Sequence, residues 1–198
     1  MAREAGWLRP WLPRTCTLAL GVAACVSVAL ALASGAGASG ARSGCPHARA
    51  RPDEATIRQL RAATLCLLNK ARAPKHLDPL TANLHLTRIA SRHSKLMVAH
   101  DCFRHKCSGE DPLAQRLKTS GYLAGAQKWA YAEDLGYEST PRRMVLRWLR
   151  TTYDRKNLLS RRYVDVGLGL AAGAPTRHAR DSRFVTYTVD LAWRKPPA

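Results

Sequence analysis

The sequence predicts an α+β fold in which helices pack on a small antiparallel sheet. Helical spacing of apolar residues dominates the chain after residue 56, and two stretches with strand-like alternation follow near the C-terminus. The 198 residues, 46% of them apolar, leave room for one ordinary domain. Because the helices precede the strands instead of alternating with them, a parallel doubly wound sheet is disfavoured.

The first helix is expected after Asp53, which can cap it. Apolar or small residues then recur every three or four positions from Ile57 to Ala71, and Pro74 ends the pattern. A second amphipathic pattern runs from Thr81 to the residue before Asp101. It places His93 and His100 on one face, seven residues apart, where two interpretations stay open: partly buried structural histidines, or ligands that meet a bound group.

Two shorter helices are indicated by capping signals. Asp111 followed by Pro112 is typical of a cap and first turn, and Gly121 ends that helix. Thr140 followed by Pro141 repeats the signal.

The two strands are predicted from alternating residues. Apolar residues occupy every second position from Val185 to Leu191 and from Val164 to Leu170. The two runs can pair across the loop over residues 171–183. The alternation predicts strands with one buried face.

The N-terminus has the anatomy of a secretory signal peptide. Basic residues precede a stretch without charge from Thr15 to Ala41, which breaks into small residues before Ala38. We therefore expect a signal peptide over residues 1–38, a flexible linker over 39–55, the folded domain over 56–194 and a tail over 195–198. This organisation indicates a secreted, extracellular protein without a transmembrane segment after processing, and a polytopic membrane protein is excluded. An uncleaved signal would instead be a single membrane anchor.

Four cysteines remain after residue 38, and an even number outside the cytoplasm indicates disulfides. We expect Cys45 to pair with Cys66 and Cys102 with Cys107. The alternative is a zinc site, because two histidines alternate with two cysteines within eight residues. Zinc would require reduced thiols, which an oxidising compartment disfavours. The residues of this alternative site are His100, Cys102, His105 and Cys107.

The chain is strongly basic, with a formal charge of +18. Such a surface favours anionic polymers or acidic lipid surfaces. The basic residues are spread along the chain without a dense tract, so no specific nucleic-acid partner is expected. A GC-rich coding sequence can also produce this arginine and alanine content without selection for binding.

A series of short motifs follows along the chain. The motifs are Leu67-Leu68-Asn69-Lys70, Leu80, His93-Ser94-Lys95-Leu96-Met97, Phe103-Arg104-His105, Ser120-Gly121-Tyr122, Ala132-Glu133-Asp134-Leu135, Trp148, Asn157-Leu158-Leu159, Tyr163, Val166-Gly167-Leu168-Gly169 and Tyr187-Thr188-Val189-Asp190-Leu191. In their order and spacing these motifs resemble the CAP superfamily, the cysteine-rich secretory and pathogenesis-related proteins, in its bacterial secreted form. The resemblance spans roughly Ile57 to Leu191.

The resemblance implies a three-layer α/β/α sandwich with a central antiparallel sheet, and a cleft lined by His and Glu that binds a divalent cation in some members. His105 matches the first family histidine and Glu133 the family glutamate. Asp154 stands where the family has its second histidine, and Thr151 where eukaryotic members often place a further acid. The implied cleft set is therefore His105, Glu133 and Asp154.

One imidazole and two carboxylates would carry a formal charge of about −2 when the histidine is neutral. Without a cation the two carboxylates should repel and raise one pKa. Such a set suits Mg²⁺, Ca²⁺ or Mn²⁺ at least as well as zinc. The alternatives stay open: Arg155 and Lys156 neutralise the set, Asp154 caps the turn that begins at Arg155, or Glu133 is a buried acid with His105 as its partner.

The standard sequence signatures of hydrolases and nucleotide-binding proteins are missing from the chain. We therefore predict a secreted, non-enzymatic protein that binds a cell-envelope polymer or lipid through its cleft and basic surface. The alternative is a metal-assisted extracellular hydrolase acting on cell wall or protein with His105, Glu133 and Asp154.

Overall fold

The computed structural model describes residues 44–176 and 183–195, and its centre is a four-stranded sheet in the order β1-β3-β4-β2. The strands are β1 (Thr81–Ala82), β2 (Lys128–Glu138), β3 (Asp165–Ala172) and β4 (Val185–Lys195). The predicted pairing of the two alternating runs is confirmed, because β3 and β4 are antiparallel with Leu168 opposite Val189. β2 pairs antiparallel with the other side of β4, whereas the short β1 is parallel to β3.

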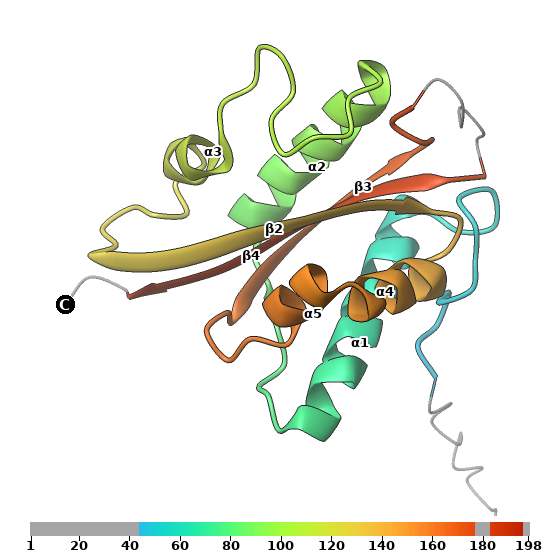
Figure 1. Ribbon diagram of the computed structural model, residues 1–198, viewed down its shortest axis with the longest axis horizontal. Helices are drawn as coiled ribbons and strands as arrows, with labels where there is room; N and C mark the ends of the chain where they lie inside the picture. The colour runs from blue at the N-terminus through green and yellow to red at the C-terminus, as the bar shows by residue number, and fades with distance from the viewer. Residues whose placement is uncertain (1–43, 177–182, 196–198) are drawn as a thin grey trace, which may run out of the picture. The chain divides into compact units, whose positions relative to one another are not determined.

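Helices cover both faces of this sheet. They are α1 (Ile57–Arg72), η1 (Ala73–Lys75), α2 (Leu84–Ala99), α3 (Leu113–Thr119), α4 (Pro141–Arg150) and α5 (Thr152–Leu158). The helices α2 and α3 form one layer, and α1, α4 and α5 form the other (Figure 1). The expected three-layer α/β/α sandwich is therefore observed.

The prediction that the strands bury a single face is wrong. Every residue of β4 from Val185 to Ala192 is buried. The polar position Thr188 lies beneath the layer formed by α2 and α3, where its hydroxyl group is 2.8 Å from that of Ser94 in α2. Two covered faces explain why β4 has no solvent side along most of its length.

The helix boundaries follow the predicted signals with three corrections. The second helix, α2, begins at Leu84 with Asn83 as its N-cap, and Thr81, where it was expected to start, lies in β1. Thr56, not Asp53, caps α1 through a capping box with Gln59. At α3 the N-cap is Pro112, which forms no side-chain cap, so Asp111 does not cap this helix. The predicted cap at Thr140 is confirmed, because its hydroxyl accepts a hydrogen bond from the backbone N–H of Arg143.

The predicted signal peptide and the start of the expected linker lie outside the described residues. The described part of that linker, residues 44–55, is held to the domain by the Cys45–Cys66 disulfide. The backbone N–H of Arg142 also donates to the carbonyl of Ala48. Over residues 44–176 and 183–195, no helix combines the length and the apolar character that spanning a bilayer requires.

Candidate functional site

A buried glutamate connects a loop, a helix and the central sheet. Glu133 of β2 contacts His105 through a 2.9 Å bond between its Oε1 and the imidazole Nδ1. Its other oxygen, Oε2, accepts a 2.8 Å bond from Nη2 of Arg116 in α3. The same nitrogen donates to the backbone carbonyl of His105. The His105 side chain is 65% exposed and the Glu133 side chain 3%, so the imidazole forms the solvent edge of this group.

These contacts keep Glu133 ionised. Burial alone would raise the pKa of Glu133, but the bond with His105 and the positive charge of Arg116 lower it. The same bond raises the pKa of His105 against the opposing effect of burial. The charge of Glu133 is therefore compensated within the protein by Arg116. The geometry agrees with the alternative in which Glu133 is a buried acid and His105 its hydrogen-bond partner.

A second pair of an acid and a histidine, Glu110 and His93, lies next to Arg116. Oε2 of Glu110 accepts a 2.7 Å bond from Nδ1 of His93, which is fully buried. Burial is the main cause that lowers the pKa of His93, so this imidazole is neutral. Nη1 of Arg116 lies 3.6 Å from Oε1 of Glu110. Arg116 thus forms ion pairs with both glutamates.

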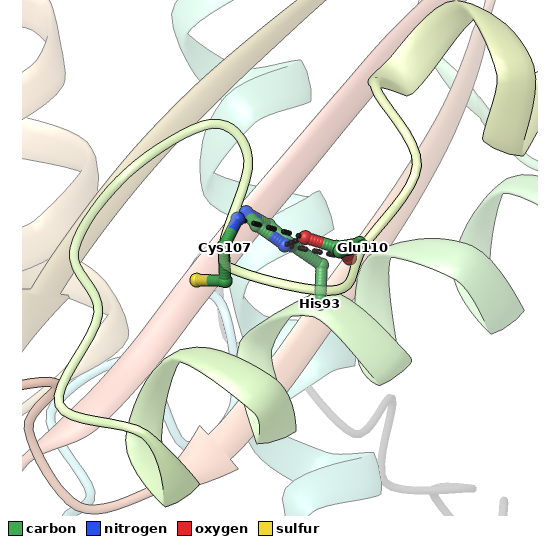
Figure 2. Close-up of side chains that lie close together, drawn as sticks. All are labelled: His93, Cys107 and Glu110. Carbon is green, nitrogen blue, oxygen red and sulfur yellow. Dashed lines mark hydrogen bonds and ion pairs between the residues drawn. The ribbon is translucent and has the colours of Figure 1, made fainter.

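Among the described residues, one set of three gathers possible ligand atoms within 4.8 Å of one another: His93, Cys107 and Glu110 (Figure 2). The sulfur of Cys107 is bonded to that of Cys102, and Glu110 is already bonded to His93. Because Cys107 is in a disulfide, it has no thiolate with which to bind a metal. Both predicted disulfides are present, and the alternative zinc site that used free Cys102 and Cys107 is wrong. His100, one of its proposed ligands, is exposed at the end of α2.

Asp154 lies beside a different acid. It occupies the first turn of α5, which begins at Thr152, so Asp154 does not cap a turn starting at Arg155. Its closest acidic neighbour is Asp134, whose Oδ1 accepts a 2.7 Å bond from Asn157. Burial raises the pKa of Asp134 to about 7, the bond from Asn157 opposes this, and the Asp154 carboxylate adds to it.

A further carboxyl group, that of Asp190, lies opposite Glu133 in the β2–β4 pair. The carboxyl groups of Asp190 and Glu133 share a side-chain hydrogen bond, in which a protonated Asp190 is the donor. Burial and the nearby charge of Glu133 raise the pKa of Asp190 well above its ordinary value. Asp190 is therefore neutral, which limits the charge at this point of the sheet to that of Glu133.

Glu133 is already fully engaged by protein groups and offers no free oxygen to a divalent cation. Both carboxylate oxygens of Glu133 are engaged by His105 and Arg116, and the guanidinium already supplies the compensating charge. Asp154 lies with Asp134 instead. In the described part of the chain, the ligand atoms of His105, Glu133 and Asp154 do not gather around one point. The observed arrangement does not fit one ion held by these three residues.

An open cleft of about 360 Å³ lies over this group. His105, Lys106 and Glu133 line it together with aromatic and apolar side chains. Tyr131 is 40% exposed and Tyr153 67% exposed. Asp154 does not line the cleft. The remaining lining residues are Pro112, Leu113, Ala132, Asn157 and Tyr163.

Sequence reasoning missed Arg116 and Glu110 as members of this group. Arg116 lies 17 residues from Glu133 within a short helix, and no local pattern distinguishes it from the many other arginines of the chain. Its role follows only from the way α3 packs against the sheet. A buried arginine always requires an acceptor, but the sequence does not reveal the burial.

The raised pKa of Asp134 predicts a pH-dependent stability. Between its unfolded pKa of about 4 and its folded value, the folded state binds more protons, so this group lowers stability as pH rises to about 7. We expect Asp134→Asn to raise the free energy of unfolding by about 2–4 kcal/mol at pH 8 and to change it little at pH 4. Urea unfolding at both pH values measures this.

Asp111→Asn, which changes an exposed aspartate, is the matched control and should leave stability within about 0.5 kcal/mol at either pH. If Asp134→Asn has the same effect at pH 4 and pH 8, the proton is not held by Asp134.

The architecture, the disulfides and the cleft define a class: disulfide-bonded α/β/α sandwich domains with a His–Glu cleft. The profile of the family described as "CAP: Cysteine-rich secretory protein family" matches residues 65–190. The chain belongs to this family. No curated protein matches the chain.

Two solved structures share the fold. An extracellular protein containing a SCP domain from Bacillus anthracis superimposes with a TM-score of 0.51 at 23% identity, over 68% of this chain and 39% of that protein. This chain thus spans less than half the length of that protein. An outer surface protein from Borrelia burgdorferi gives a TM-score of 0.54 at 17% identity, over 66% of this chain and 90% of that one.

Proposed function

We propose that this chain is an extracellular, non-enzymatic binding protein whose cleft takes an anionic segment of a cell-envelope polymer. The single observation that carries the proposal is the engagement of both oxygens of Glu133 beneath an open cleft. The names of the Bacillus anthracis and Borrelia burgdorferi proteins, extracellular and outer surface, support the location.

The charges at the cleft rim support an anionic ligand. Lys106 is exposed at the rim, and the raised pKa of His105 favours its charged form. The one acid that lines the cleft, Glu133, is paired with Arg116 and does not oppose an incoming anion. Exposed Tyr131 and Tyr153 add flat apolar surfaces on which a polymer can lie.

The hydrolase alternative has less support from the same geometry. A general acid or base needs a proton or lone pair directed at the substrate. Glu133 is ionised with both oxygens occupied, and Asp154 lies outside the cleft lining. Neither residue is therefore arranged as an acid/base pair across a scissile bond.

Co-sedimentation of the purified protein with insoluble cell envelope tests the proposal. We expect Lys106→Glu to lower the apparent affinity about fivefold or more, and added salt to weaken binding of the parent protein. The control is Lys95→Glu, which reverses an exposed charge on α2 outside the cleft. Equal loss in both variants would point to the general basic charge and contradict a cleft site. Envelope hydrolysis that Glu133→Gln abolishes would overturn the non-enzymatic proposal.

A further inference from the structure

We propose that the ligand segment in this cleft is an extended acidic peptide that adds as a strand to the outer edge of β2 and pairs with the backbone of Glu133. This inference rests on the proposed function, because it names the ligand class of the same cleft.

β2 is the last strand of the sheet, so half of its backbone groups have no strand partner. Backbone N–H and C=O groups alternate in direction along an edge strand. The carbonyls of Tyr131, Leu135 and Tyr137 accept bonds from side chains outside the sheet, which shows that these residues direct their backbone groups outward. Glu133 lies between Tyr131 and Leu135 at the same parity, so its backbone N–H and C=O also point outward.

Side chains cover the outward carbonyls on either side of Glu133. The hydroxyl of Tyr163 donates to Tyr131, and Nε1 of Trp148 donates to Leu135 at 3.0 Å. Nη1 of Arg147 donates to Tyr137 farther along. Such covering is how proteins prevent unwanted strand pairing at an edge. Among the described residues, no comparable hydrogen bond reaches the backbone N–H or C=O of Glu133.

This uncovered position lies in the cleft. Tyr131, Ala132 and Glu133 are consecutive lining residues, so the β2 edge forms part of the cleft wall. Glu133 as a whole residue is 6% exposed although its side chain is 3% exposed. Its exposed surface therefore includes backbone. A peptide lying in the cleft can donate to the Glu133 carbonyl and accept from its N–H.

The cleft also defines the peptide. Strand addition places successive side chains of the ligand on opposite sides. One side of the cleft offers the ammonium group of Lys106 and the exposed imidazole of His105, which suit a carboxylate. Tyr153 offers an aromatic surface on the side of α5. Because Tyr163 and Trp148 cover the neighbouring carbonyls, the pairing is short and requires about four extended residues, or roughly 13 Å.

Amide NMR with a terminally blocked Ala-Glu-Ala-Glu peptide tests this directly. Hydrogen exchange of the Glu133 amide should slow at least about tenfold at saturation. The amides of Ala132 and Asp134 face β4, so their exchange should change little. An analogue with ester links in place of the amides keeps the charges and loses the donors, and we expect it to bind about tenfold more weakly. Lys106→Glu should weaken the peptide about fivefold, with Lys95→Glu as the control.

The outcomes separate this inference from the proposed function. If the ester analogue binds as well as the peptide and the Glu133 amide is unaffected, strand addition is wrong while anion binding in the cleft stands. If the peptide and the cell envelope both fail to respond to Lys106→Glu, both proposals fail. Slowed exchange at Glu133 alone, with binding lost in the ester analogue, supports strand addition.

Discussion

Replacing Arg116 with methionine is expected to destabilise the fold by about 3–5 kcal/mol, because it leaves two buried glutamates without their shared cation. The Glu133 side chain is 3% exposed and that of Glu110 9%, so water cannot replace the guanidinium. Urea unfolding of the variant and the parent at pH 8 measures this difference. A loss of this size is a large share of the stability of an ordinary domain.

A change of pH and a second substitution test whether the loss of stability in Arg116→Met comes from the unpaired charge of the buried glutamates. Without Arg116 the pKa of Glu133 should rise, so the loss should be smaller at pH 5 than at pH 8. Adding Glu133→Gln should recover part of the stability at pH 8. Arg92→Met is the control for a lost surface arginine on α2 and should change stability by no more than about 0.5 kcal/mol. Similar losses for both arginine variants would contradict the buried network.

Gly169→Ala is expected to cost at least about 3 kcal/mol or to prevent folding. A Cβ atom at this position would lie 2.0 Å from the backbone carbonyl oxygen of Ala90 in α2. The obstacle is helix backbone and not a flexible side chain, so α2 would have to move away from β3. That movement would open the layer in which Ala90 and Leu168 are buried.

Gly44→Ala is the matched control, because a Cβ there meets nothing within 4 Å. Chemical unfolding and the yield of folded protein compare the two variants. If the Gly169→Ala variant is as stable as the Gly44→Ala variant, α2 does not pack directly on β3 at this position.

Local sequence signals were sufficient for α1, α2, α3 and α4 and for one strand pair, whereas the short α5 was missed. Thr140 before Pro141 marks the start of α4, and alternation marks β3 and β4, because these signals act within a few residues. The strand β2 was missed. Exposed and buried residues do not alternate regularly along β2. Its first two residues, Lys128 and Trp129, are exposed, whereas most residues of its second half are buried or half-buried.

The sequence predicted only part of the arrangement in the cleft. The family motifs indicated His105 and Glu133, which the fold brings into contact. Asp154 stands at the position of the second family histidine, but in the first turn of α5 it lies beside Asp134.

By itself, the sequence determined the family and the α+β class, because these depend on motif order and on local periodicity. It also predicted both disulfide pairs, which the structure confirms, and most helix boundaries. Only the tertiary structure decided that Arg116 neutralises Glu133 and that the backbone of Glu133 is left uncovered in the cleft. The physical reason is that burial and the choice of ion partner arise when α3, β2 and β4 pack together, and no local pattern encodes that packing.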